Sequence, residues 1–221
     1  MSAPRALPRC FTVLFALLVA VHLGALLADA TTLVQLTKPA LMPVLAAYAA
    51  LRGAPRPLVA ALLCGCGGDV LLQLGGETAF LAGMGCFAAG HLCYLTLFAR
   101  SGRRRTVPWV AYGYGAVWLG STAALWSGLD AGLRVPVAAY SLLLTAMALG
   151  ALRTGVRAGL GGALFLLSDG LIAAGLADWP QLPVPQFWIM ATYIAAQYLL
   201  TTGLLRQTAR EAPLRPLPAA A

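Results

Sequence analysis

Eight long apolar stretches, separated by short breaks, follow one another along the chain. Each is close to the roughly 20 residues that an α-helix needs to cross a bilayer, and each is too apolar for a helix that faces water. The breaks contain Gly, Pro and charged residues, which end such stretches. We expect an all-α polytopic membrane protein whose eight transmembrane helices span about residues 10–28, 33–51, 57–75, 79–99, 107–127, 132–151, 158–177 and 185–205.

The composition supports this class and excludes others. Of 221 residues, 60% are hydrophobic and only 10% are charged, whereas soluble domains carry about 25% charged residues. We therefore expect a single integral membrane domain over residues 1–221. The net charge of +8 comes from arginines in short breaks between apolar stretches, so no soluble basic face is available and a nucleic acid partner is excluded.

The charges alternate between successive breaks. Arginines lie before the first stretch and after the second, fourth, sixth and eighth, while the other breaks carry Asp29, Glu77, Asp130 and Asp178 with Arg134 as their one arginine. By the positive-inside rule both termini are cytoplasmic. The run of three arginines at 103–105 is a topology signal or a site for anionic lipid headgroups. The arginine- and alanine-rich breaks favour a bacterial inner membrane, although proteins of the endoplasmic reticulum membrane follow the same charge rule.

Two further sequence features have alternative interpretations. The first stretch and Ala28-Asp29-Ala30 resemble a signal peptide, but the apolar run exceeds the usual signal core, so we count it as the first helix. All five cysteines lie in apolar stretches, where free cysteine acts as a small hydrophobic residue. Cys64 and Cys66 would point to different sides of a helix, so we expect neither a disulfide framework nor a metal site with His91.

Two aspartates, Asp69 and Asp169, lie inside the third and seventh stretches. A carboxylate within a membrane span is costly and marks a functional site unless it is paired. The two stretches are four apart and run in the same direction. Prolines occur just before them, in the second stretch (Pro39) and the sixth (Pro136). We expect a four-helix unit that is duplicated in parallel.

Other intramembrane polar residues lie at the same depth as the aspartates. This layer extends from the membrane midplane to the helix ends opposite the arginine-containing breaks, as one shared cavity predicts. His91 and Tyr94 share a helix face, as do Tyr193 and Gln197. Each also has a simpler interpretation: Lys38 could extend to the interface, the histidines could be packing residues, and the tyrosines could be isolated core polar groups. The candidates for substrate binding or orientation are Lys38, His91, Tyr94, Tyr140, Ser168, Tyr193 and Gln197.

Two carboxyls in a dry cavity can divide the work of acid catalysis. Burial favours a neutral carboxyl and a nearby cation favours an ionised one, so one aspartate could donate a proton while the other stabilises positive charge. This suits cleavage through an oxocarbenium-like state, and the membrane location indicates a lipid substrate. The sequence contains neither G-x-S-x-G nor H-E-x-x-H, and its two histidines exclude a three-histidine metal site.

Several motifs are similar to those of the YhhN/TMEM86 family, the lysoplasmalogenases. They are Lys38-Pro39, Gly68-Asp69, His91-Leu92-Cys93-Tyr94, Pro136 to Tyr140, Ser168-Asp169-Gly170 and Thr192-Tyr193 with Ala195-Ala196-Gln197. The resemblance implies hydrolysis of the vinyl-ether bond of lysoplasmalogens to a fatty aldehyde and glycerophosphocholine or glycerophosphoethanolamine. It implies a lysophospholipid substrate, no metal and no organic cofactor.

With this activity, Asp69 and Asp169 are the catalytic candidates, and the sequence does not tell which is acid and which is base. Two other classes of function remain open. A small-molecule or lipid transporter also combines four-helix repeats with midplane polar groups, and a non-catalytic membrane scaffold would need only the helix-packing residues. The sequence leaves the oligomeric state and headgroup preference open.

Overall fold

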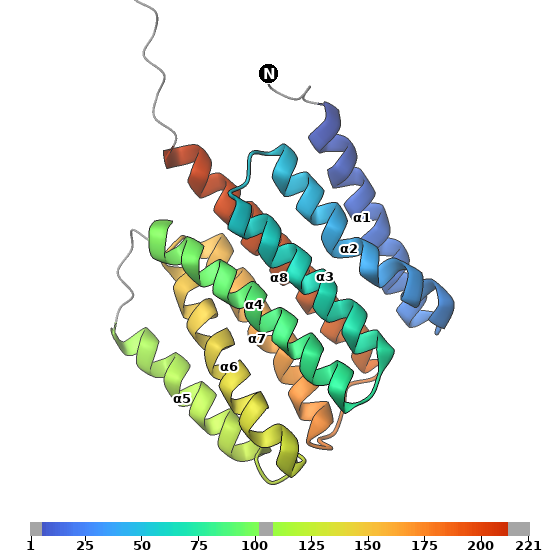
Figure 1. The fold of residues 1–221 in the computed structure, drawn as a ribbon, viewed down its shortest axis with the longest axis vertical. Helices are drawn as coiled ribbons and strands as arrows, with labels where there is room; N and C mark the ends of the chain where they lie inside the picture. Colours follow the sequence, from blue (N-terminus) through green and yellow to red (C-terminus); the bar gives the residue numbers. More distant parts are fainter. Residues whose placement is uncertain (1–5, 102–107, 212–221) are drawn as a thin grey trace, which may run out of the picture.

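Eight α-helices form one bundle in the computed structural model, which describes residues 6–101 and 108–211 (Figure 1). Short turns join most consecutive helices, which run antiparallel as expected. No strand occurs in these two ranges. The helices are α1 (Ala6–Leu27), α2 (Thr31–Leu51), α3 (Arg56–Leu74), α4 (Glu77–Ser101), α5 (Pro108–Leu125), α6 (Ala131–Leu152), α7 (Val156–Leu176) and α8 (Pro185–Glu211).

The predicted all-α membrane architecture is confirmed. Seven of the described helices are long and apolar enough to cross a bilayer. The exception, α5, contains two tryptophans, two tyrosines and three glycines among its 18 residues, and these lower its hydropathy. It still lies alongside α6, roughly parallel to the other helices (Figure 1).

The helix bounds differ most from the prediction at the two ends of the chain. α8 continues six residues beyond the expected end at 205, and α1 begins four residues before the expected start at 10. Hydropathy reports where a helix leaves the membrane, but backbone hydrogen bonding continues through Arg206, Gln207 and the residues that follow, which are compatible with a helix. The next proline, Pro213, lies outside the described residues, and proline is the residue that forbids continuation.

The last three helices of each half pack in the same order. α3 packs most closely on α4 and α7 on α8, while α2 lies against α3 and α6 against α7. α4 also packs on α6 and thereby joins the halves. The duplication of a four-helix unit stays a prediction, because the shared packing order does not extend to α1 and α5.

Prolines within α2 are accommodated by a neighbouring helix. Pro43 has no N–H, so the Pro39 carbonyl four residues earlier lacks its helical donor. The Cys66 thiol of α3 donates to this carbonyl at 3.3 Å. A partner on an adjacent helix is how a broken helical hydrogen bond is satisfied inside a membrane, and here it also fixes α2 beside α3.

Glycines allow α7 to lie close to α8. A Cβ on Gly161 would lie 2.9 Å from the Ala196 carbonyl oxygen and 2.9 Å from the Leu200 backbone nitrogen. Neither backbone atom can move without displacing α8. Small residues at such crossings are typical of helix packing in membranes.

Gly161→Val should therefore separate α7 from α8 and lower the free energy of unfolding by about 1–3 kcal/mol or more. The measurement is thermal unfolding in detergent. Gly85→Val is the matched control, because a Cβ on Gly85 of α4 would meet no atom within 4 Å. Equal shifts in melting temperature for the two variants would contradict the close-approach argument.

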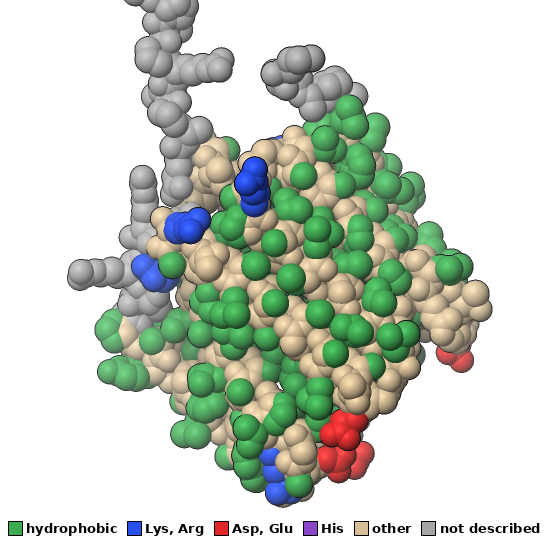
Figure 2. Space-filling model, in the orientation of Figure 1, with side chains coloured by type: hydrophobic (Ala, Val, Ile, Leu, Met, Phe, Trp, Pro, Cys, Tyr) green, Lys and Arg blue, Asp and Glu red, His purple; other side chains and the backbone are tan. Residues whose placement is uncertain are grey.

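Charged side chains gather at opposite ends of the bundle (Figure 2). Arg52 and Arg153 cap α2 and α6 at the end where α1 begins and α8 ends, whereas Glu77 and Asp130 lie where α4 and α6 begin. Arg134, the expected exception, lies near the acidic end and donates to the Leu129 carbonyl at 3.0 Å. The predicted run at 103–105 lies outside the described residues, and the orientation of the bundle in a membrane stays a prediction.

Candidate active site

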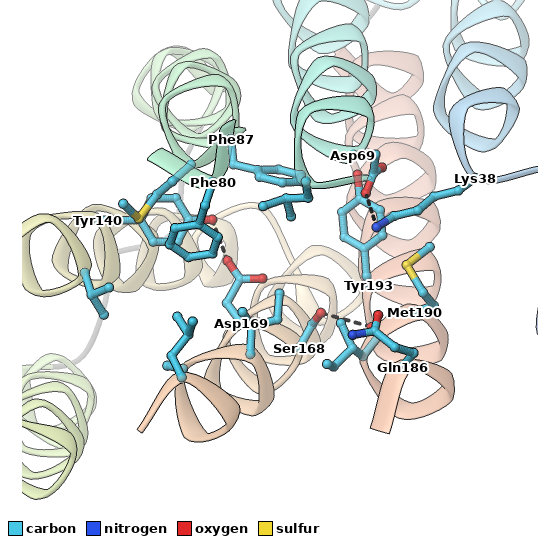
Figure 3. Close-up of a pocket in the computed structure, with 17 residues that line it drawn as sticks. Lys38, Asp69, Phe80, Phe87, Tyr140, Ser168, Asp169, Gln186, Met190 and Tyr193 are labelled. Carbon is cyan, nitrogen blue, oxygen red and sulfur yellow. Dashed lines mark hydrogen bonds and ion pairs between the residues drawn. The ribbon is translucent and has the colours of Figure 1, made fainter. Parts of the chain in front are cut away.

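A cavity of about 260 Å³ lies within the bundle, and we call it the polar cavity because both intramembrane aspartates line it (Figure 3). Six helices contribute side chains to its wall. The wall is apolar except for a few groups, which is the usual character of a small-molecule site. These helices supply, among others, Lys38 (α2), Asp69 (α3), Phe87 (α4), Tyr140 (α6), Asp169 (α7) and Tyr193 (α8).

Asp69 is paired with a lysine. Its side chain is 3% exposed, and Oδ1 lies 3.8 Å from Nζ of Lys38, which is 13% exposed. Its other oxygen, Oδ2, is buried and has no hydrogen-bond partner among the described residues. The carboxyl thus has a neighbouring positive charge and, in Oδ2, an oxygen that can accept a hydrogen bond from a bound molecule.

Asp169 has a phenol as its partner. The Tyr140 hydroxyl donates to Oδ2 of Asp169 at 2.5 Å and lies 3.1 Å from Nε2 of His91. A phenol has one proton, so Nε2 of His91 must be the donor to Tyr140. This assigns the tautomer of the histidine and leaves Nδ1 unprotonated, buried and without a partner in the described structure. His91 therefore holds Tyr140, and Tyr140 holds Asp169.

A second series of hydrogen-bonded side chains lies behind Asp69. Tyr94 donates to Oε1 of Gln197 at 2.6 Å, and Nε2 of Gln197 lies 3.5 Å from the Tyr193 hydroxyl. Tyr193 points toward Asp69 in Figure 3. Tyr94 and Gln197 are themselves fully buried. Their part is to fix Tyr193, and they do not reach the cavity.

Each aspartate is held by residues from both halves of the chain. Asp69 on α3 meets Lys38 from α2 of its own half and faces Tyr193 from α8 of the other half. Asp169 on α7 meets Tyr140 from α6 of its own half, and through it His91 from α4 of the other. The surroundings of the two acids are therefore equivalent in helix arrangement but differ in chemistry.

The structure brings six of the nine predicted site residues to one cavity: Lys38, Asp69, Tyr140, Ser168, Asp169 and Tyr193. His91, Tyr94 and Gln197 are buried behind its wall. The Ser168 hydroxyl donates to the Ile189 carbonyl of α8 at 3.0 Å, which ties the two helices together. Outside the site, the His22 ring bonds Thr37 at 2.8 Å, as the packing interpretation predicts.

The sequence analysis missed Gln186, a polar residue of the cavity wall in the first turn of α8. Its position was the available signal, because Gln186, Met190 and Tyr193 repeat at the spacing of one helix face. Among the described residues there is no group of three His, Cys, Asp or Glu side chains placed to hold a metal ion, and all five cysteines are free.

The fold and this cavity define a polytopic all-α membrane protein with two acids on one cavity inside its bundle. The chain belongs to the YhhN family, whose model matches residues 33–204. This confirms the resemblance noted in the motifs.

Curated relatives carry a functional name. The human protein named lysoplasmalogenase TMEM86B is 37% identical over 149 residues, which are 67% of this chain and 63% of that protein. The rat protein of the same name is 36% identical over 149 residues, covering 67% and 61%. The chain thus spans less than two thirds of the length of these relatives. No solved structure matches it significantly.

Proposed function

We propose that this protein is a membrane hydrolase that cleaves the vinyl-ether bond of lysoplasmalogens, releasing a fatty aldehyde and a glycerophospho-alcohol. The observation that carries the proposal is the pair of aspartates on one cavity, one beside a lysine and one beside a tyrosine. The family and the name of its relatives support the same activity.

Hydrolysis of a vinyl ether begins with protonation of the carbon that lies away from the ether oxygen. The product of this step is an oxocarbenium ion, to which water adds, and the resulting hemiacetal collapses to aldehyde and alcohol. The reaction needs a proton donor on one side and a group that stabilises positive charge and orients water on the other. A positioned acid or base typically contributes about 10²–10⁴-fold.

The partners of the two acids suggest which role each takes. Lys38 places a positive charge 3.8 Å from Asp69 to compensate a carboxylate there, which suits the group that orients water and stabilises the oxocarbenium ion. Among the described residues no Lys or Arg nitrogen lies within 4 Å of the Asp169 carboxyl. Asp169, oriented by Tyr140, is then the proton donor.

The remaining candidates have supporting roles. Lys38 presents the positive charge of the cavity and can also meet the lipid phosphate. Tyr193, held by Gln197 and Tyr94, orients Asp69 or the attacking water. Ser168 maintains the distance between α7 and α8 beside Asp169.

The orientation follows from the charge pattern. We infer that the arginine-rich end of the bundle, where α1 begins and α8 ends, faces the cytoplasm. In a bacterium this would place the protein in the inner membrane. The cavity lies nearer the opposite end, since Asp69 is close to the end of α3.

The test is an assay of the purified protein in detergent with three lysophospholipids of equal chain length, joined by vinyl-ether, alkyl-ether or ester bonds. Aldehyde release from the vinyl ether alone is the expected result. If no lipid is cleaved, while preloaded proteoliposomes exchange a labelled lipid or solute, the protein is a transporter and the hydrolase proposal fails.

Tyr140→Phe should lower the rate of aldehyde release about tenfold or more, because it breaks the hydrogen bonds that join His91 to Asp169 while keeping the ring. A positioned proton donor loses much of its contribution when its orientation is lost. Tyr112→Phe is the matched control, since Tyr112 is 76% exposed on α5. Equal activity of the two variants would show that Tyr140 does not position Asp169 for proton transfer.

A further inference from the structure

A second cavity of about 670 Å³ lies between α5 and the pair formed by α6 and α7. Its wall is mostly apolar and aromatic, with contributions such as Val117, Leu144 and Leu166. Its volume falls within the range of about 300–1,000 Å³ in which proteins hold small ligands. We call this cavity the α5 cleft.

The α5 cleft adjoins the polar cavity. Val137, Tyr140, Asp169 and Ala173 line both. The carboxyl and phenol that form the candidate proton donor therefore stand at the boundary between a small polar chamber and a larger apolar one. A molecule with a polar head and one apolar chain could occupy both chambers and would pass Asp169 where its two parts meet.

The α5 cleft exists because α5 stands away from its own half. None of the residues of α5 is buried, and a hydrogen bond of 3.1 Å from the Trp118 indole to the Ser141 hydroxyl of α6 bridges the space. In the other half the corresponding helix, α1, packs on α2 and α8 and buries Phe15, His22 and Ala25. The opening is thus specific to the half that carries Asp169.

We propose that the α5 cleft binds the hydrocarbon chain of the lysolipid while the polar cavity holds its glycerophospho-headgroup. This assignment rests on the proposed function. In a lysoplasmalogen the vinyl-ether bond joins the chain to the glycerol, so this division places the reacting bond at Asp169 without any rearrangement of the lipid.

The positions of Asp169 on α7 and Gly113 on α5 give the direction in which the hydrocarbon chain of the lipid extends. Asp169 lies about 20 Å from the start of α7, and Gly113 of α5 lies about 7.5 Å from the start of that helix, at 1.5 Å per residue. Both helices begin at the arginine-rich end. Measured from the first residue of each helix, Gly113 therefore lies about 12 Å closer to the arginine-rich end than Asp169 does, and a long hydrocarbon chain reaches it while a short one does not.

Two glycines of α5 provide a matched pair of variants. A Cβ on either Gly113 or Gly115 would meet no atom within 4 Å, but only Gly113 lines the cleft. Gly113→Trp should lower kcat/KM for an octadecenyl lysoplasmalogen by at least about tenfold, leaving that for a hexenyl analogue within twofold of the original protein. Gly115→Trp should leave both values unchanged. An unchanged chain-length preference in Gly113→Trp, or equal losses in both variants, would overturn the proposal.

A second measurement does not require hydrolysis. An alkyl-ether lysolipid, which has no vinyl bond to cleave, carries a diazirine at the end of its chain and is photolysed with the original protein. Labels concentrated on the cleft-facing residues of α5 and on Leu144 or Leu166 support the proposal, and labels spread over all membrane-facing helices overturn it. If the protein cleaves no vinyl ether yet labels at the cleft, the chain site stands and the proposed reaction fails.

Discussion

Asp169→Asn should lower the rate of aldehyde release from a lysoplasmalogen by at least about 100-fold. The amide can still accept the hydrogen bond from Tyr140, so the local packing is kept, but it has no acidic proton to transfer to the vinyl carbon. The measurement is single-turnover aldehyde formation by the purified variant in detergent, with lipid binding measured separately.

Asp178→Asn is the control for this change. Asp178 is exposed and has a positive φ of 56°, a conformation that asparagine tolerates well. The control should keep full activity. If Asp169→Asn also kept it, the assignment of Asp169 as the proton donor would be wrong.

Variants of Asp69 and Lys38 should behave differently, because the double variant should recover stability without recovering activity. Either Asp69→Asn or Lys38→Met leaves one charge of the pair unmatched in a largely buried place, and breaking a buried ion pair in this way costs up to about 3–5 kcal/mol. The double variant removes both charges. It should regain the melting temperature of the original protein while remaining at least about 100-fold less active.

This double variant separates a catalytic role from a structural one. The measurements are thermal unfolding and aldehyde release for the original protein, both single variants and the double variant. If activity returned together with stability in the double variant, Asp69 would be needed only to neutralise Lys38, and the reaction would have to proceed with Asp169 alone.

The helices could be predicted from the sequence because the length and hydropathy of each stretch largely determine whether it forms a membrane span, without reference to the rest of the chain. Seven of eight expected stretches are apolar enough to cross a bilayer, and the bounds of α2, α3, α6 and α7 agree within two residues. The cost of a buried carboxylate likewise singled out Asp69 and Asp169, because that cost depends on their surroundings in the sequence and not on contacts.

The contacts within the site could not be predicted, because they depend on how each helix is rotated about its axis. Spacing places Tyr193 and Gln197 on one face, but it does not tell that Tyr193 reaches the cavity while Gln197 lies behind it. Nor does it tell that His91 acts on Asp169 through Tyr140. The α5 cleft was equally hidden, since the sequence of α5 does not tell how far that helix lies from α6 and α7.

The interleaving of the two halves around the acids limits what a shorter protein could do. A single four-helix unit lacks the helix from the opposite half that completes each acid's surroundings, so a protein of that size would have to pair with a second copy. Two identical copies would present two identical acids to the chamber. In one polypeptide the two acids need not have identical surroundings, and here a lysine lies beside one acid and a tyrosine beside the other.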